Sequence, residues 1–509
     1  MIAMMKIVKK YRKMTMKIDI SRTKLAFLLP LVLLFTMNSC DDKLDINPES
    51  FISSDAFYKN EEEVNLAVIA IYNSLYEMMD LEWNVTEIRS DNTFFRPDGT
   101  PDSDTDRFTL DRFTLTPTNR LSSDYYRACY STIALANRVL ENLDVVENTD
   151  TRDQYEGEAR FLRAHAYFNL VRLYGPLVIV DESISGEEAL TLDRSPEMEV
   201  YDFILEDLKI AKENLPESFE NQQTGRATKW AAQGILAKVY LTLEDYNSSK
   251  TELAGIINEG PFELLENYDD VFDVDNEYNS EIIFAVRYQS GSVGLGAPFA
   301  NYFAPLQTGD LIVKGDGRSY NVPTESISQA YPVNGERKEP SMADFWLNSN
   351  DEPEYDKHVV KYNSDFSVYN DSGVDWPVLR YADVLLMMSK TTLETEGIAP
   401  SLELLNKVRE RAGATPYDVA DINSSFAMKL AIEEERRLEF AFENQRWFDL
   451  VRTDRAVTVI NQHFNREPVY NDPNSPEKGA EPIQEWQLLL PIPQYELDLN
   501  PNIAQNIGY

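Results

Sequence analysis

The chain has little cysteine and little histidine. Its 509 residues include two cysteines, Cys40 and Cys129, and three histidines, His165, His358 and His463. The histidines are too scattered to predict a zinc site. If Cys40 is covalently modified at the N-terminus of the mature chain, only Cys129 remains and no intrachain disulfide is possible. Stability must then come from a packed core, which a chain of this length can supply. We expect Cys129 to be an inert buried thiol.

The motifs of common enzymes are also missing. The chain contains no G-x-S-x-G, no H-E-x-x-H and no Walker sequence. A glycosidase needs two placed carboxylates, but with 86 Asp and Glu residues the presence of a pair is uninformative. We therefore expect a protein that is not an enzyme, and a surface glycosidase is the less favoured alternative.

No cofactor or metal is expected either. Asp273, Asp275 and Glu277 have a spacing that resembles a calcium loop. The glycine that such a loop requires at its sixth position is absent, so the sequence does not support a calcium site.

No apolar run is long enough to span a membrane. The apolar run of interest lies near the N-terminus. Residues 25–35 are apolar but too few to span a bilayer, which takes ~20 residues. They follow a basic stretch and precede Ser39 and Cys40, an order typical of an export signal. We expect a lipoprotein signal peptide over residues 1–39, with Met14 or Met16 as alternative starts. Cys40 is then the lipidated residue, and 40–60 form the anchor and tether. The alternative is an ordinary secreted protein in which Cys40 is incidental.

The charge balance is strongly acidic. The formal net charge is −38, which repels nucleic acid and anionic lipid. We therefore expect no nucleic-acid partner. Neutral glycans and cationic peptides are both compatible ligands.

Most of the remaining chain has helical periodicity. In the segment 158–174, Leu162, Ala166, Leu170 and Leu173 form one apolar stripe, and Gly175 and Pro176 then end the helix. Helix hairpins are expected near 62–143, 151–215, 227–258 and 380–412. Their small and large residues fit a divergent tetratricopeptide pattern, and unrelated amphipathic hairpins are the alternative.

The region near 260–380 differs, because it is rich in Asn, Asp, Gly, Ser, Pro and aromatic residues. Residues 281–288 are expected to form a short strand. The rest is predicted to be long loops, which in a compact domain are usually functional. The expected fold is therefore mainly α, with an irregular loop-rich second lobe within a single unit, 61–509.

Six motifs occur in order along the chain, at 158–175, 227–241, 379–386, 405–413, 434–450 and 490–493, the last ahead of 500–509. Together they resemble the SusD/RagB family, and Asp41 and Asp42 resemble the surface-export signal of Bacteroidetes lipoproteins. The charged residues within 434–450, Arg436, Arg437, Glu439, Glu443 and Arg446 among them, are interpreted as structural ion pairs rather than as a catalytic cluster.

The resemblance implies a lipid-anchored protein exposed on the outer membrane. Such proteins have an α/α scaffold that packs on a SusC-like TonB-dependent transporter, and they capture oligosaccharides for import without catalysing a reaction. A peptide-capturing receptor of the RagB type is the alternative, which the negative charge favours for basic peptides. A repeat scaffold without a small ligand is a further alternative.

Ligand contacts are expected from two aromatic stretches, because flat rings bind sugar faces and polar groups bind hydroxyls. In the family, ligand residues often follow a Ser-Asp-Asn sequence such as residues 90–92. The candidates are Trp83, Arg89, Asn92, Phe94 and Phe95 from the first stretch, and Tyr288, Tyr302, Phe303, Tyr320 and Trp346 from the loop-rich region. For each of them, a core aromatic or structural polar residue is the alternative.

Overall fold

The computed structural model describes residues 57–97, 101–220, 225–471 and 479–509. The chain divides into two units, Met1–Tyr58 and Lys59–Tyr509. The expected signal peptide, Cys40 and most of the tether lie outside the described residues. Everything below concerns the second unit.

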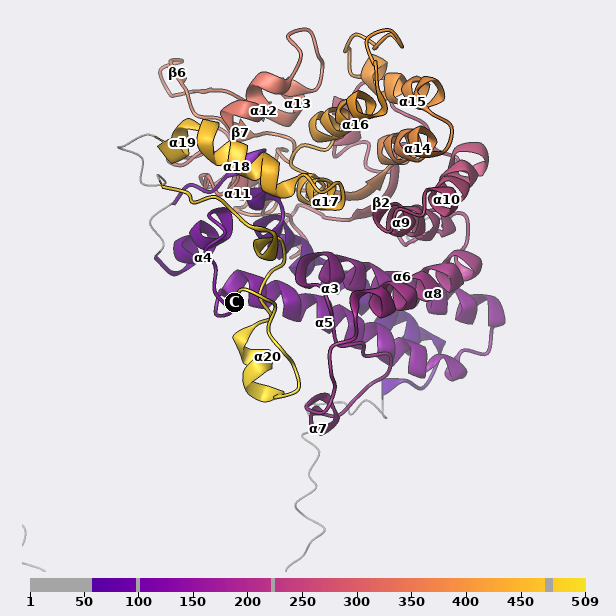
Figure 1. Ribbon diagram of the computed structural model, residues 1–509. Helices are drawn as coiled ribbons and strands as arrows, with labels where there is room; N and C mark the ends of the chain where they lie inside the picture. The colour runs from indigo at the N-terminus through magenta and orange to yellow at the C-terminus, as the bar shows by residue number, and fades with distance from the viewer. Residues whose placement is uncertain (1–56, 98–100, 221–224, 472–478) are drawn as a thin grey trace, which may run out of the picture. The chain divides into compact units, whose positions relative to one another are not determined.

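Helices dominate this unit, so the expected fold class is confirmed (Figure 1). The long helices are α3 (Glu61–Val85), α5 (Arg120–Glu141), α6 (Thr149–Tyr174), α8 (Glu197–Asn214), α9 (Lys229–Thr242), α10 (Tyr246–Glu259), α14 (Tyr381–Thr395), α15 (Ile398–Arg411) and α16 (Ser425–Glu439). Shorter ones are α4 (Pro101–Asp111), α7 (Gly186–Ala189), α17 (Arg446–Arg452), α18 (Ala456–Arg466), α19 (Pro468–Asn471) and α20 (Gln494–Leu499).

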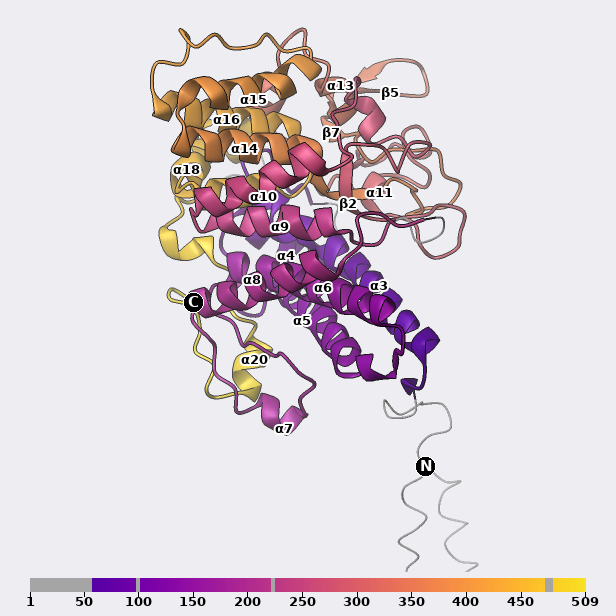
Figure 2. The same ribbon diagram turned by 90° about the vertical axis from the view of Figure 1, so that its right-hand side faces the viewer.

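The long helices pack as successive pairs. α3 packs on α5, α6 on α8, α9 on α10, and α14 on α15. Neighbouring pairs are in contact through α5 and α6, α8 and α9, and α10 and α14, so the pairs form one continuous stack (Figure 2). Whether these pairs are tetratricopeptide repeats stays a prediction.

Side-chain caps fix where several of these helices begin. The side chains of Asn60, Asn119 and Asn148 each accept a hydrogen bond from the backbone N–H three residues on. Such caps satisfy donors that the first turn leaves without a partner. α6 ends at Gly175, whose φ of 73° suits glycine, as the sequence predicted.

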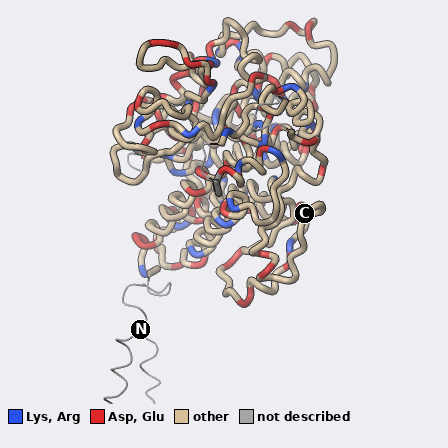
Figure 3. Tube along the Cα trace, turned by 90° about the vertical axis from the view of Figure 1, so that its left-hand side faces the viewer, with Lys and Arg blue, Asp and Glu red and all other residues tan. Residues whose placement is uncertain are grey.

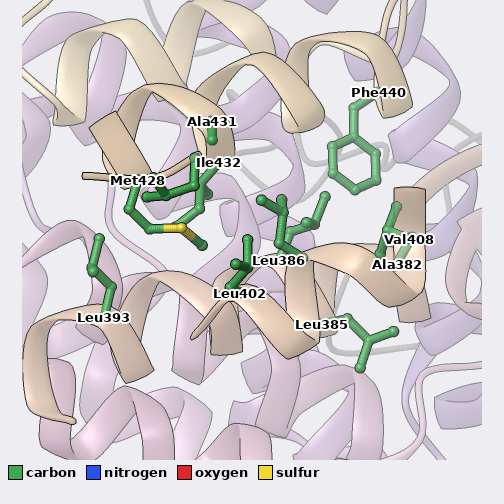
Figure 4. Close-up of a cluster of buried hydrophobic side chains, with 12 residues drawn as sticks. Ala382, Leu385, Leu386, Leu393, Leu402, Val408, Met428, Ala431, Ile432 and Phe440 are labelled. Atoms are coloured by element: carbon green, nitrogen blue, oxygen red, sulfur yellow. The ribbon is translucent and has the colours of Figure 1, made fainter. Parts of the chain in front are cut away.

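The core of the last pair shows how the stack is held. Ala382, Leu386, Leu402, Met428 and Ile432 belong to one buried cluster contributed by α14, α15 and α16 (Figure 4). Apolar residues at helical spacing on three helices thus meet on one side of each helix.

The loop-rich lobe contains short two-stranded antiparallel sheets. β2 (Ile282–Val286), within the predicted strand, pairs with β8 (Trp376–Arg380). β1 (Thr93–Phe94) pairs with β3 (Val322–Pro323), β4 (Met342–Ala343) with β7 (His358–Val359), and β5 (Trp346–Leu347) with β6 (Pro353–Glu354). Short helices α11 (Phe299–Phe303), α12 (Glu325–Ala330) and α13 (Lys338–Ser341) lie among the loops.

Buried ion pairs join the lobe to the helices. Arg380, at the end of β8, contacts Glu281, Glu439 and Glu443 at 2.6, 3.0 and 2.9 Å. Lys361 of the lobe reaches Glu443 at 2.8 Å. The interpretation of the charges in 434–450 as structural ion pairs is therefore confirmed for these residues.

Candidate ligand-binding surface

Five of the ten predicted binding residues meet in one aromatic cluster: Trp83, Phe95, Tyr302, Phe303 and Tyr320. The Trp83 and Tyr320 rings are stacked, with centroids 6.2 Å apart and planes 12° apart. Phe303 meets Trp83 edge-on at 5.3 Å, and Phe95 lies 6.0 Å from Tyr320. The two stretches singled out in the sequence are thus adjacent in space.

Arg107 of α4 fixes this cluster from one side. Its guanidinium lies 3.8 Å from the ring centroid of Tyr320 and 5.3 Å from that of Trp83. Its Nε donates to Asn84 at 2.9 Å. A cation over aromatic faces stabilises the arrangement, and sequence reasoning did not identify Arg107.

Beside the cluster, Asp80 of α3 has hydrogen-bonding capacity that the protein does not use. Its Oδ1 is buried with no hydrogen-bond partner. Burial raises the pKa of this carboxyl to about 6, although nearby Arg107 and a hydrogen bond with Tyr302 act in the opposite direction. A buried acceptor without a partner costs free energy that a ligand donor can recover.

The hydroxyl of Tyr288 is also buried without a partner. Burial raises the pKa of Tyr288 well above its usual value, with the charge of Asp80 as the next cause. Asp80, Tyr288 and Tyr302, here named the Asp80 site, therefore offer an acceptor, a phenol and a half-buried ring in one place. A sugar hydroxyl can both donate and accept, which suits this set.

A second set of groups, from residues 94–96 and the loop-rich lobe, is partly or fully exposed. Arg96 holds Asp356 through its Nη1 at 2.7 and 2.9 Å, and its guanidinium lies 5.9 Å from the ring centroid of Phe94. Tyr355 is 83% exposed and Phe345 47% exposed, with their ring centroids 6.0 Å apart. We name these five residues the Tyr355 surface. Apart from Phe94, they were not among the predicted residues, although aromatics in a polar loop region are a usable signal.

Several predicted residues have other roles in this structure. Arg89 donates to the carbonyl of Gln487 at 2.8 Å, with its guanidinium 4.2 Å from the Trp447 ring centroid. Asn92 accepts a hydrogen bond from Arg437 at 2.8 Å. Trp346 is half-buried in β5, and no ring contact joins it to the cluster among the described residues.

Burial separates the candidates. Trp83, Arg89, Asn92, Phe95 and Phe303 are at most 1% exposed. Direct contact with a ligand would require the elements that cover them to move. Tyr288 and Tyr320 are buried too, whereas Phe94, Tyr302 and Trp346 keep partly accessible rings. The accessible candidates are therefore Tyr302, within the Asp80 site, and the Tyr355 surface, whereas Asp80 Oδ1 and the Tyr288 hydroxyl are buried.

Within the described ranges, no group of three or more His, Cys, Asp or Glu side chains is placed to hold a metal ion. Over the same ranges, no helix is both long enough and apolar enough to cross a membrane.

Two family models match the chain. The model described as "SusD family" matches residues 333–509, and the one described as "Starch-binding associating with outer membrane" matches residues 42–241. Among curated proteins, the chain is similar to SusD-like protein P25 of Formosa agariphila, with 27% identity covering 94% of this chain and 98% of that protein. A SusD-like protein of Bacteroides ovatus is 25% identical, with 84% and 82% covered.

Solved structures agree on the fold. A laminarin binding SusD-like protein has a TM-score of 0.73 and 24% identity, covering 89% of this chain and 100% of that one. Surface glycan-binding protein A from Bacteroides thetaiotaomicron, in complex with laminarihexaose, has a TM-score of 0.74 and 20% identity, covering 87% and 99%.

Proposed function

The chain belongs to the SusD/RagB family, and on this premise we propose that it captures an extracellular oligosaccharide for import. In this proposal, it is a lipoprotein anchored through Cys40, exposed on the outer membrane, and it delivers its ligand to a SusC-like TonB-dependent transporter. It acts by binding alone, without catalysis and without a cofactor.

The observation that carries glycan binding is the Asp80 site. Asp80 Oδ1 and Tyr288 Oη are buried without partners beside the accessible ring of Tyr302. A sugar ring on Tyr302 would lie beside both atoms, and its hydroxyls would reach them once the groups that cover them move. Binding would then satisfy polar groups that are costly when they have no partner. The Tyr355 surface supplies exposed rings beside an Arg–Asp pair for further sugar units.

The test is native affinity electrophoresis of the purified protein through gels that contain single polysaccharides, laminarin among them. We expect one polysaccharide to retard the protein. Tyr302→Ala and Asp80→Asn should each weaken that binding by about tenfold, which corresponds to about 1.4 kcal/mol. Tyr495→Ala is the matched control, because Tyr495 is a 66% exposed tyrosine on α20.

Unaltered retardation of both variants would place glycan binding elsewhere on the protein. Absence of retardation by every polysaccharide, together with no heat of binding for short oligosaccharides, would refute glycan capture. Release of sugar from a retarding polysaccharide by the pure protein would contradict the proposal that it is not an enzyme.

Capture of basic peptides is the second candidate, and the charge of the chain favours it. The formal net charge is −38, and acidic positions are spread along much of the described chain (Figure 3). Calorimetric titration with basic and neutral oligopeptides of equal length distinguishes the two candidates. Saturable binding of only the basic peptide, weakened by salt, would favour the peptide receptor.

Delivery has a separate test. Tagged protein extracted gently from the outer membrane should co-purify with a β-barrel protein of the TonB-dependent class. Cells that lack this barrel should retain surface binding of the ligand but lose its uptake. Uptake that is unchanged without the barrel would contradict the proposed partnership.

A further inference from the structure

Between the helices α6, α8, α9 and α17 lies a cavity of about 130 Å³ that is lined by basic residues. Four basic side chains, Arg172, Lys238, Arg436 and Arg452, face two carboxylates, Glu197 and Asp449. Such an excess of positive groups is unexpected in a chain with a formal net charge of −38. The cavity is formed by the helical scaffold and shares no lining residue with the Asp80 site or the Tyr355 surface.

Three of the four basic groups already have carboxylate partners. Asp383 lies 2.6 Å from both Lys238 and Arg436. Asp449 lies 2.7 Å from Arg436 and 2.8 Å from Arg452. Two carboxylates are therefore shared among three cations, and neither is within ion-pair distance of Arg172.

Arg172 is the cation that remains. Among the described residues, no carboxylate lies within 4.0 Å of it. Its Nε donates to the carbonyl of Phe168 at 3.0 Å, and its Nη2 donates to the side chain of Asn169. A guanidinium has five N–H groups, so its remaining donors are free to bind a ligand in the cavity.

The guanidinium of Arg172 is also held in place. Its carbon lies 3.8 Å from the ring centroid of Phe168 and 3.5 Å from that of Phe448. Contact with two aromatic rings restricts the movement of the group before any ligand arrives. A fixed fork of donors matches the two oxygens of a carboxylate.

The positive charges around the cavity affect the pKa of the neighbouring His165. Burial, together with the charges of Arg172 and Lys238, lowers the pKa of His165 to about 3. Burial is also the main cause of the lowered pKa of Arg172, about 10. Arg172 is partly buried and has no ion pair within the described part of the chain, although the charges of Glu82 and Asp449 favour its charged form. An anion in the cavity would add a direct counter-ion.

The rest of the lining indicates what kind of anion fits. Leu241, Met387 and Val171 supply apolar wall beside the basic groups. The volume is close to that of cavities of about 150 Å³ that admit a molecule as large as benzene. We propose that this cavity binds a small organic carboxylate, with its oxygens on Arg172 and Lys238 and its short apolar tail against Leu241 and Met387.

The experiment is calorimetric titration of the purified protein in a buffer free of carboxylate and phosphate, with propionate, acetate and inorganic phosphate as probes at equal ionic strength. We expect saturable binding of one propionate, tighter than acetate because of the longer tail. Phosphate that binds as tightly as propionate would overturn the carboxylate assignment.

Variants locate the site. Arg172→Gln should weaken propionate binding at least tenfold, and Arg172→Lys should weaken it less, because lysine keeps the charge but loses the fork. Arg127→Gln is the control for a lost positive charge, since the side chain of Arg127 is 67% exposed.

Thr242→Leu leaves Arg172 intact and occupies cavity space, so it tests the proposal if Arg172→Gln does not fold. No saturable binding of propionate to the unaltered protein, or unaltered binding to Thr242→Leu and to a folded Arg172→Gln, would overturn the proposal.

Discussion

The guanidinium of Arg380 lies 3.0 Å from the carboxylate of Glu439, and both side chains are at most 1% exposed. Glu439 also pairs with Arg337 at 2.9 Å and with Arg411. Three arginines from three segments thus converge on one carboxylate. Their charges overcome the opposing effect of burial, so the pKa of Glu439 lies well below its usual range.

Removing this carboxylate charge should be strongly destabilising. We expect Glu439→Gln to lower the free energy of unfolding by about 3–5 kcal/mol, because the arginines would stay buried with less compensation. Glu434→Gln is the matched control. Glu434 is 44% exposed and 3.9 Å from Arg437, so its loss should cost no more than about 1 kcal/mol. Urea unfolding of both variants measures the difference, and similar losses would contradict the importance assigned to Glu439.

A second buried carboxylate, that of Glu82, predicts how the stability of the protein depends on pH. Burial raises the pKa of Glu82 to about 7 from its ordinary 4.5. A raised acid pKa means that the folded state binds the proton more tightly, so this contribution to stability is present below about pH 4.5 and is lost as the pH rises through about 7. Glu82→Gln should therefore flatten the change in stability over this window, with an effect of at most a few kcal/mol.

The measurement is the free energy of unfolding at several pH values between 4 and 8 for the unaltered protein and for Glu82→Gln. Glu77→Gln serves as the control from the same helix, α3. If the Glu82→Gln curve runs parallel to that of the unaltered protein, Glu82 does not titrate in this window.

The helices could be predicted from the sequence better than the contacts between residues that are far apart along the chain. The stripe through Leu162, Leu170 and Leu173 and the stop at Gly175 are local signals, so α6 was predictable. Trp83 was predicted to contact a ligand because it begins a stretch, residues 83–96, that combines aromatic and polar side chains. Its neighbours Phe303 and Tyr320 come from far along the chain, and nothing local to Trp83 indicates that they cover it.

The candidate site was predictable only by region. Tyr302 was identified because aromatics in the loop-rich segment are typical of binding surfaces. Asp80 was missed, since a single acidic residue on an amphipathic helix resembles any solvated position. Only the packing of Tyr302 and Arg107 around Asp80 gives its carboxylate a distinct environment.

Glycine packing provides a third prediction. A Cβ at Gly234 in α9 would lie 2.2 Å from Leu379 of β8. We expect Gly234→Ala to lower the free energy of unfolding by about 1–2 kcal/mol, because the overlap outweighs the better helix propensity of alanine. Gly186→Ala is the control, since no atom lies within 4 Å of the added Cβ. Thermal unfolding of both variants is the measurement, and an unchanged midpoint for Gly234→Ala would show that the Leu379 side chain moves aside at little cost.

The last prediction concerns the anchor, which follows from sequence and family alone. Acyl chains contribute about 0.8 kcal/mol per buried CH₂, and stable anchoring takes more than one chain. Cys40→Ser removes the proposed attachment atom, so we expect the protein to move from the membrane fraction to the soluble fraction. Cys129→Ser is the matched control: Cys129 is fully buried in α5, so its substitution should leave membrane attachment unchanged. Labelled fatty acid should be incorporated into the unaltered protein and into Cys129→Ser but not into Cys40→Ser. If Cys40→Ser stays at the membrane and still takes up label, the anchor lies at another residue.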